Sequence, residues 1–298
     1  MLGIICLLSQ SVLPAAAETG EGSPEVSASG SSLTKVYLNG AVEESGDGTT
    51  ADTAVKTLLE AYEKLDSAKS MEENVIVVCG ETTLSADTAV NLPETAATIT
   101  GKDGETDYQS ALRNGTGTII LNADTRFADI QLECGKIANR LHKTVLDITG
   151  KVGSAEGCDV EVSGGTYTNV YVYSGSGTGS ASILGGQVTN LAAANGGKFD
   201  SLNLEISGGS VMEIQAGGRW TGATIDLVNI VLSGAPVIRN LNGKGACTAC
   251  SETRLLFAGF TGTISGTVSN VDKVGVSAVG GNTSAAASDV AAAFEMAG

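Results

Sequence analysis

Two glutamates of the central region have the side-chain type and the spacing that acid–base chemistry on a glycan requires. Glu161 and Glu205 each lie two residues before a Ser-Gly-Gly phrase in a stretch that repeats itself. If successive repeats stack like paired strands, about 4.8 Å apart, the two carboxylates are two rungs, or about 10 Å, from each other. That separation is close to the upper limit for an inverting glycosidase pair or for a shared Ca²⁺ site. The alternative, which the sequence favours, is a solvated sheet whose outward residues are simply charged.

Four further residues of the same region are weaker candidates. Asp226 and Arg239 could complete a catalytic group, and Arg219 with Trp220 could contact a ligand. Trp220 is the only tryptophan and follows a Gly-Gly-Arg turn, where an exposed indole would form a platform for a sugar ring. An indole packed against a neighbouring loop is the equally good alternative.

The cysteines give little support for a metal or redox centre. Cys247 and Cys250 form one C-x-x-C unit, but it has no second pair and no histidine nearby. A zinc site needs more ligands than this, so no metal and no cofactor is predicted, and the redox state of the pair is left open. Most of the other cysteines adjoin strand-like runs and are predicted to be small core residues.

The elements that must position these side chains are repeats. One short phrase occurs four times, with its first glycines 21, 23 and 26 residues apart, at Val162–Tyr167, Ile183–Val188, Ile206–Val211 and Leu232–Val237. A period in the low twenties is typical of a solenoid, in which each repeat buries its apolar face against its neighbours. Val162, Ile183 and Ile206 are therefore predicted to form one interior column.

The phase of the repeat indicates strands. β-branched and small residues alternate between Gly, Asn and Ser punctuation, and no 3.6-residue apolar period is present. The Leu-x-x-Leu-x-Leu frame of a leucine-rich repeat is also missing, which leaves an all-β parallel β-helix as the predicted fold. Two more interior columns are expected, the first from Tyr167, Val188, Val211 and Val237, and the second from Val170, Leu191, Ile214 and Leu241.

Polar and glycine positions agree with this model. Asn169 and Asn190 have the same phase in adjacent repeats, where a left-handed turn residue is expected with a side chain that bonds along the stack. The repeated glycines allow a corner that a β-branched residue would prevent.

Composition limits the class of protein. The 298 residues carry a net charge of −16, are 42% hydrophobic but only 4% aromatic, and include 40 glycines, which suits a narrow solenoid better than a compact globule. Nucleic acid is not expected as a partner, because phosphate binding depends on Lys and Arg. An extracellular glycan or a host surface is the partner class that remains.

The chain divides into four segments. Residues 1–17 are uncharged and end in an Ala-x-Ala site, as in a signal peptide that lacks its basic start, so a secreted or cell-surface protein is predicted. Residues 18–33 form a flexible spacer, and residues 34–280 the β-helix domain, of which 34–70 are a strand–helix cap. Residues 281–298 are a tail or a C-terminal cap, and no stretch is expected to span a membrane.

The cap contains the one helical pattern. Val55, Leu58 and Tyr62 have helical spacing, with Asp52 as the expected N-cap, and such a helix would block end-to-end association of the solenoid. Asp47, in Gly-Asp-Gly, lacks the other residues of a phosphate or calcium loop and is predicted to be a turn residue. The polar stretch 101–117 is predicted to be a loop that projects from the stack.

The order strand, Gly-Asp-Gly turn, amphipathic helix and then Val75–Gly80 resembles the N-terminal cap of right-handed parallel β-helix proteins of the pectin-lyase-like superfamily, especially uncharacterised secreted proteins of anaerobic gut bacteria. The resemblance covers roughly residues 35–280. It implies a right-handed coil and an activity on acidic polysaccharides, by a lyase with Ca²⁺-binding carboxylates and a base, or by a hydrolase with an aspartate cluster, a Gly-His-Gly turn and an Arg-x-Lys.

Neither catalytic signature is present. The only histidine, His142, lies in Arg140–Lys143 without a flanking glycine. The leading interpretation is therefore a non-catalytic surface module for adhesion or glycan contact. The alternatives are a polysaccharide lyase or glycoside hydrolase, and a spacer in a larger surface protein. The sequence leaves the oligomeric state open.

Overall fold

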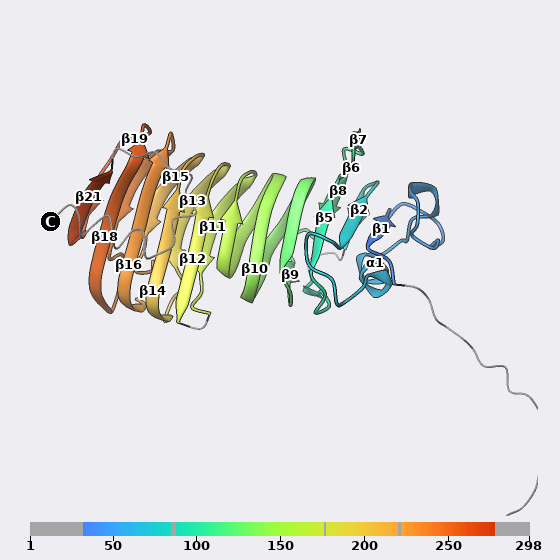
Figure 1. Cartoon of the computed structure of the whole chain (residues 1–298), viewed down its shortest axis with the longest axis horizontal. Helices are drawn as coiled ribbons and strands as arrows, with labels where there is room; N and C mark the ends of the chain where they lie inside the picture. The colour runs from blue at the N-terminus through green and yellow to red at the C-terminus, as the bar shows by residue number, and fades with distance from the viewer. Residues whose placement is uncertain (1–31, 85–87, 176, 220–221, 278–298) are drawn as a thin grey trace, which may run out of the picture. The chain divides into compact units, whose positions relative to one another are not determined.

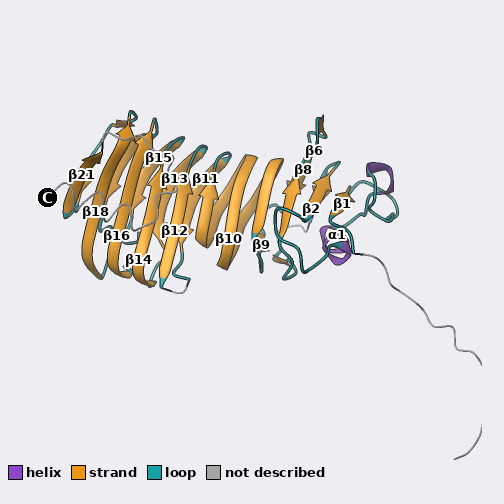
Figure 2. Cartoon of the chain, in the orientation of Figure 1, coloured by secondary structure: helices purple, strands orange, loops and turns teal. Residues whose placement is uncertain are grey.

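The computed structural model describes residues 32–84, 88–175, 177–219 and 222–277, and this part of the chain is a parallel β-solenoid of about nine turns. Nineteen strands join through parallel pairings, and β6 and β7 form a separate antiparallel hairpin. Successive turns lie side by side from β1 to β21 (Figure 1). Strands run through the whole stack, whereas the helical turns are confined to the region around β1 (Figure 2).

The strands before the repeats are short except for the last. They are β1 Lys35–Leu38, β2 Val75–Val78, β3 Thr82–Thr83, β4 Val90–Asn91, β5 Ala97–Thr100, β6 Lys102–Asp103, β7 Thr106–Asp107, β8 Ala111–Arg113, β9 Thr118–Ile120 and β10 Thr125–Val162. The strands of the repeats and the end coil are β11 Thr166–Val172, β12 Thr178–Ile183, β13 Gln187–Ala193, β14 Lys198–Ile206, β15 Ser210–Gln215, β16 Thr224–Gly234, β17 Val237–Asn242, β18 Ala249–Phe260, β19 Thr263–Ile264, β20 Val268–Ser269 and β21 Lys273–Ser277.

The predicted interior columns are present. Val162 pairs with Ile183, Ile183 with Ile206, and Ile206 with Leu232, and all of these side chains are fully buried. The second column runs from Tyr167 through Val188 to Val211, and the third from Val170 to Leu241. Stacked aliphatic side chains, all in one continuous cluster, form the core.

The fourth repeat departs from the prediction by one residue. Val237 pairs with Ser210 and is 52% exposed, and Ile238 takes the interior position opposite Val211. The corner after Leu232 contains Pro236 and is one residue longer than its counterparts. Because strand side chains alternate between faces, one extra residue exchanges the buried and exposed positions.

The two glycines of each corner are required for different reasons. A Cβ on Gly208 would lie 2.1 Å from the carbonyl oxygen of Leu184 in the preceding coil, so there is no space for one. Gly209 has a φ of +67°, in the left-handed region that glycine adopts without strain.

Asn169 and Asn190 stack as predicted, but not in left-handed turns. They lie within β11 and β13, and the Asn190 amide donates to Asn169 Oδ1 at 3.1 Å and to the Thr168 carbonyl at 3.1 Å. Among the described residues, only Gln109, Asp129 and Asn270 are non-glycine residues with positive φ. The asparagines bond along the stack from extended backbone, which the strand already provides.

The helix is shorter than the sequence suggested. The helix α1 spans Leu58–Lys64, and its N-cap is Thr57, whose side chain forms a capping box with Glu60. Asp52 lies in the 3₁₀ turn η1 Ala51–Thr53, and Val55 forms a bridge with Leu38. The reciprocal Thr–Glu cap satisfies two backbone N–H groups, more than a lone aspartate can, and so sets the start of the helix.

The stretch 101–117 is only partly a projecting loop. The β6–β7 hairpin stands out from the stack, but β8 returns to it, with Leu112 fully buried and β8 paired with both β3 and β10. Ala111 and Leu112 supply enough apolar surface to rejoin the core.

Asp47 is a turn residue, and its contacts predict an acid-labile turn. A hydrogen bond from the Thr53 hydroxyl, and then those from the Thr49 N–H and hydroxyl, lower the pKa of Asp47 to about 2. The carboxylate therefore stabilises the turn above the unfolded pKa of about 3.9, and this contribution is lost as the pH falls toward about 2. A carboxyl ¹³C titration should give a midpoint near 2. Thr53→Val should raise that midpoint and Thr83→Val, on β3, should not; an equal midpoint in both variants would contradict the assignment.

Candidate functional site

The structure places the two predicted glutamates in one column. Glu161 pairs with Ser182, and Ser182 with Glu205, so the carboxylates are two rungs, about 10 Å, apart. Both side chains are half-buried, and the residues before and after each of them along the strand are buried. The Glu161 carboxylate is 3.3 Å from Lys143 Nζ, which neutralises it.

The other candidates are not gathered around this pair. Val231, and not Asp226, is beside Glu205, and Asp226 lies on the order of 15 Å back along β16. Arg239 is exposed on β17, which pairs with β15 beyond the glycine corner. Arg219 donates to Asn169 Oδ1 at 3.4 Å. Trp220 lies outside the described residues.

A hollow of about 740 Å³ lies on the flank of the stack beside β9 and β10, and we call it the flank hollow. Its polar lining includes Glu94, Lys136, Arg140 and His142. Its apolar lining comes from Ile120, Leu121, Ala123, Ala138 and Leu141. An apolar wall with a few converging charged groups is the usual composition of a ligand site.

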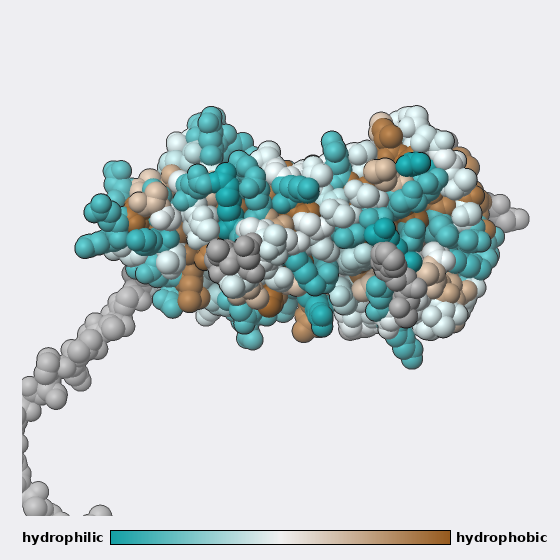
Figure 3. Space-filling view, turned by 180° about the vertical axis from the view of Figure 1, so that it is seen from behind, coloured by the Kyte–Doolittle hydropathy of each residue, from teal (hydrophilic) through white to brown (hydrophobic). Residues whose placement is uncertain are grey.

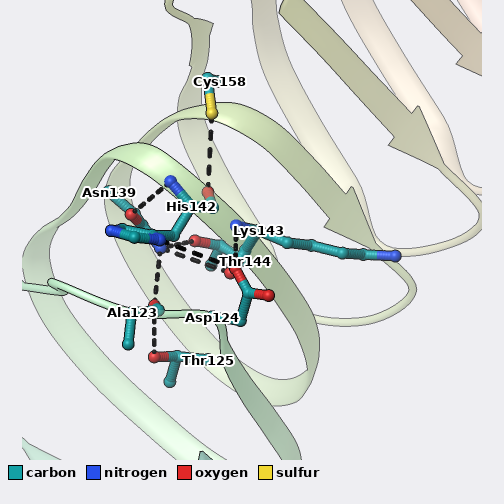
Figure 4. Close-up of polar contacts among 8 residues, drawn as sticks. All are labelled: Ala123, Asp124, Thr125, Asn139, His142, Lys143, Thr144 and Cys158. Carbon is teal, nitrogen blue, oxygen red and sulfur yellow. Dashed lines mark hydrogen bonds and ion pairs between the residues drawn. The ribbon is translucent and has the colours of Figure 1, made fainter. Parts of the chain in front are cut away.

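One buried asparagine holds the corner that carries Arg140 and His142. The Asn139 amide donates to the carbonyls of Ala123 and Lys143 at 3.2 and 3.3 Å and to the Thr144 hydroxyl at 3.0 Å, and its Oδ1 accepts the His142 N–H at 3.1 Å (Figure 4). The side chain is fully buried, so these bonds form away from water. They fix four surface residues, Arg140–Lys143, within the long strand β10.

Asp124 fixes the same corner from the preceding coil. Its Oδ1 accepts the Lys143 N–H at 2.8 Å and is 4.0 Å from His142 Nδ1 (Figure 4). Sequence reasoning missed both Asn139 and Asp124. One feature of the sequence could have identified Asn139. It lies where the alternation of apolar and polar residues in β10 ends and a polar stretch begins.

A buried carboxylate orders the cations of the flank hollow. Glu156 is 9% exposed, and it bonds Lys136 Nζ at 2.7 Å and the Tyr173 hydroxyl at 3.1 Å. The Arg140 guanidinium lies 5.1 Å from the centre of the Tyr173 ring, within cation–π range. Burial, and then the Glu156 charge, raise the pKa of Tyr173, so the phenol stays protonated and donates to Glu156. Lys136 and Arg140 are thus positioned in advance of any ligand.

The cysteines provide no metal centre among the residues described. Cys134 joins the core, and Cys247 and Cys250 pack against it as free thiols. Burial, and then the nearby Cys250, raise the pKa of Cys247 to about 11. Across the described ranges, no group of three or more His, Cys, Asp or Glu residues could hold a metal ion.

No protein-family model, curated protein or solved structure matches this chain. In the part of the chain that the structure describes, no helix has the length and apolar character that crossing a bilayer requires. Hydrophilic residues are spread over the face in Figure 3, and the hydrophobic areas between them are small.

Proposed function

We propose that this protein is an exported β-solenoid that binds a segment of an acidic extracellular glycan in the flank hollow and does not cleave it. The observation that carries the proposal is the presence of two cations, Lys136 and Arg140, around one hollow of a chain whose net charge is −16. A uronate carboxylate is the glycan group that such cations recognise, and Arg140 can bind it with two parallel hydrogen bonds. Leu141, 74% exposed at the rim, offers a surface for the C–H face of a sugar ring.

The charge pairing favours binding over catalysis. Glu156 and Glu161 are each bonded to a lysine. Each of these carboxylates already has a lysine as its partner, so it is not free to act on a substrate. The pair with Glu156 instead orders Lys136, which lines the hollow.

The second candidate is a polysaccharide lyase or glycoside hydrolase. The Glu161–Glu205 column supports it, because about 10 Å is close to the separation that an inverting pair uses. The resemblance to pectin-lyase-like proteins supports the same activity class and a right-handed coil, which is the common hand of parallel crossovers. A spacer role, and a role for α1 in blocking end-to-end association, also remain proposals.

The decisive experiment is calorimetric titration with uronate oligosaccharides, such as oligogalacturonate and oligomannuronate, and with neutral maltohexaose. We expect a uronate oligomer to bind at least about tenfold more tightly than maltohexaose, and more weakly as salt increases. Arg140→Gln should weaken uronate binding about tenfold, because a hydrogen bond to a charged group contributes about 1.5 kcal/mol or more. Lys151→Gln removes an exposed charge outside the hollow and should change affinity little.

Two results would reject this function. The first is that Arg140→Gln and Lys151→Gln each bind uronate oligomers no more tightly than neutral oligomers. The second is the appearance of unsaturated products or new reducing ends, which would support the enzyme, especially if Glu205→Gln abolished them.

A further inference from the structure

A second hollow lies where the β6–β7 hairpin leaves the stack. It encloses about 300 Å³, and its lining includes Lys102 and Asp107 of the hairpin and Asp129 of β10. We call it the hairpin hollow. It shares no lining residue with the flank hollow, so its role does not rest on the function proposed above.

Two residues of the hairpin hollow have strained backbone. Gln109 and Asp129 both have a φ of +49°, and the third non-glycine residue with positive φ in the described ranges, Asn270, lies elsewhere. Side chains larger than hydrogen rarely adopt this conformation, and such residues concentrate at functional sites. Asp107 Oδ1 accepts the Gln109 N–H at 2.8 Å and so holds the turn.

A buried hydroxyl in the lining has an unused hydrogen-bonding capacity. Ser110 is 3% exposed, and its Oγ has no hydrogen-bond partner. Buried hydroxyls in folded proteins are nearly always bonded. The backbone around it is close-packed, because a Cβ on Gly101 would be 2.7 Å from Ser110 Oγ and 2.4 Å from the Asp129 carbonyl oxygen.

The chemistry of the lining selects a neutral ligand with several hydroxyl groups. Asp107 and Asp129 accept hydrogen bonds, Lys102 and Gln109 donate them, and Gln131 and Thr149 complete a lining without apolar side chains. Lys102 Nζ is 2.5 Å from Asp129 Oδ1, so a cation that used Asp129 would have to displace the lysine. We propose that the hairpin hollow binds one neutral sugar residue, whose hydroxyls satisfy Ser110 and bridge the carboxylates and donors.

The test is an NMR titration of the ¹⁵N-labelled full chain with glucose, galactose and mannose, and separately with CaCl₂. We expect one of the sugars to shift resonances of residues 102–110 and 129–131, with an affinity in the millimolar range typical of weak small ligands. Ser110→Ala should weaken that binding about three- to tenfold, the effect of one hydrogen bond, without lowering the melting temperature.

Gln109→Gly separates a ligand role from a structural one. Glycine adopts the required φ, so the melting temperature should not fall, whereas loss of the side chain should weaken sugar binding about threefold or more. Asn270→Gly makes the same backbone change away from the hollow and should leave binding unchanged. The proposal is overturned if none of the sugars shifts these resonances, if CaCl₂ alone shifts them, or if Gln109→Gly binds the sugar as tightly as the unmodified chain.

Discussion

Gly208→Val should destabilise the solenoid by about 4 kcal/mol or more, which is an exceptional cost for one surface corner. The added Cβ would lie 2.1 Å from the carbonyl oxygen of Leu184, and this oxygen belongs to the backbone of the adjacent coil and cannot move alone. The two coils would have to separate locally, and the buried column from Val162 to Leu232 would lose its contacts. Chemical denaturation followed by circular dichroism measures the change in unfolding free energy.

Gly104→Ala is the matched control for this effect. Gly104, unlike Gly208, has positive φ, at +56°, and a Cβ there meets nothing within 4 Å. Its cost should be limited to the left-handed strain of about 1–2 kcal/mol. If Gly208→Val proved no more destabilising than Gly104→Ala, the close approach of the corners would be refuted.

Asn139→Ala should cost about 3 kcal/mol and should also disorder the rim of the flank hollow. The substitution leaves the buried carbonyl of Ala123 and the hydroxyl of Thr144 without the amide that now donates to them. Each unsatisfied buried group costs about 1–3 kcal/mol. Equilibrium urea unfolding measures the loss, and hydrogen exchange at the His142 N–H reports the local opening, because this amide donates to Asn139 Oδ1.

The control for Asn139 is Gln187→Ala, at an exposed position on β13 and away from the flank hollow. It should change stability by no more than about 0.5 kcal/mol. The same pair of variants tests the link from corner to function, since only Asn139→Ala should weaken uronate binding. If hydrogen exchange at the His142 N–H were unchanged in Asn139→Ala, the Asn139 side chain would not be what stabilises the backbone of residues 140–143.

The repeated region illustrates how far periodicity alone can go. Val162, Ile183 and Ile206 are in register and fully buried, because a constant repeat with alternating side chains leaves only one face for aliphatic residues. The same reasoning failed at Val237, where a corner one residue longer moved Ile238 inward. Counting residues finds the column but cannot locate an insertion inside a turn.

The N-terminal half shows the complementary case. No Ser-Gly-Gly phrase marks the coils before Val162, and β10 continues for 38 residues without a break. Without a fixed period, the sequence could not indicate that Glu94 and His142 would line one hollow. The candidate site predicted from the sequence therefore lay in the regular repeats, whereas both hollows lie among the irregular coils that precede them.

The sequence by itself determined the class of fold, the stacking of Glu161 with Glu205 and the need for glycine at the corners, because these follow from local periodicity and backbone sterics. Only the tertiary structure decided which residues meet across coils of unequal length, including Lys136 with Glu156 and Asp124 with the corner at His142. The reason is geometric: the path of each coil sets which side chains lie above one another, and that path depends on turn lengths and on packing with the coils on either side.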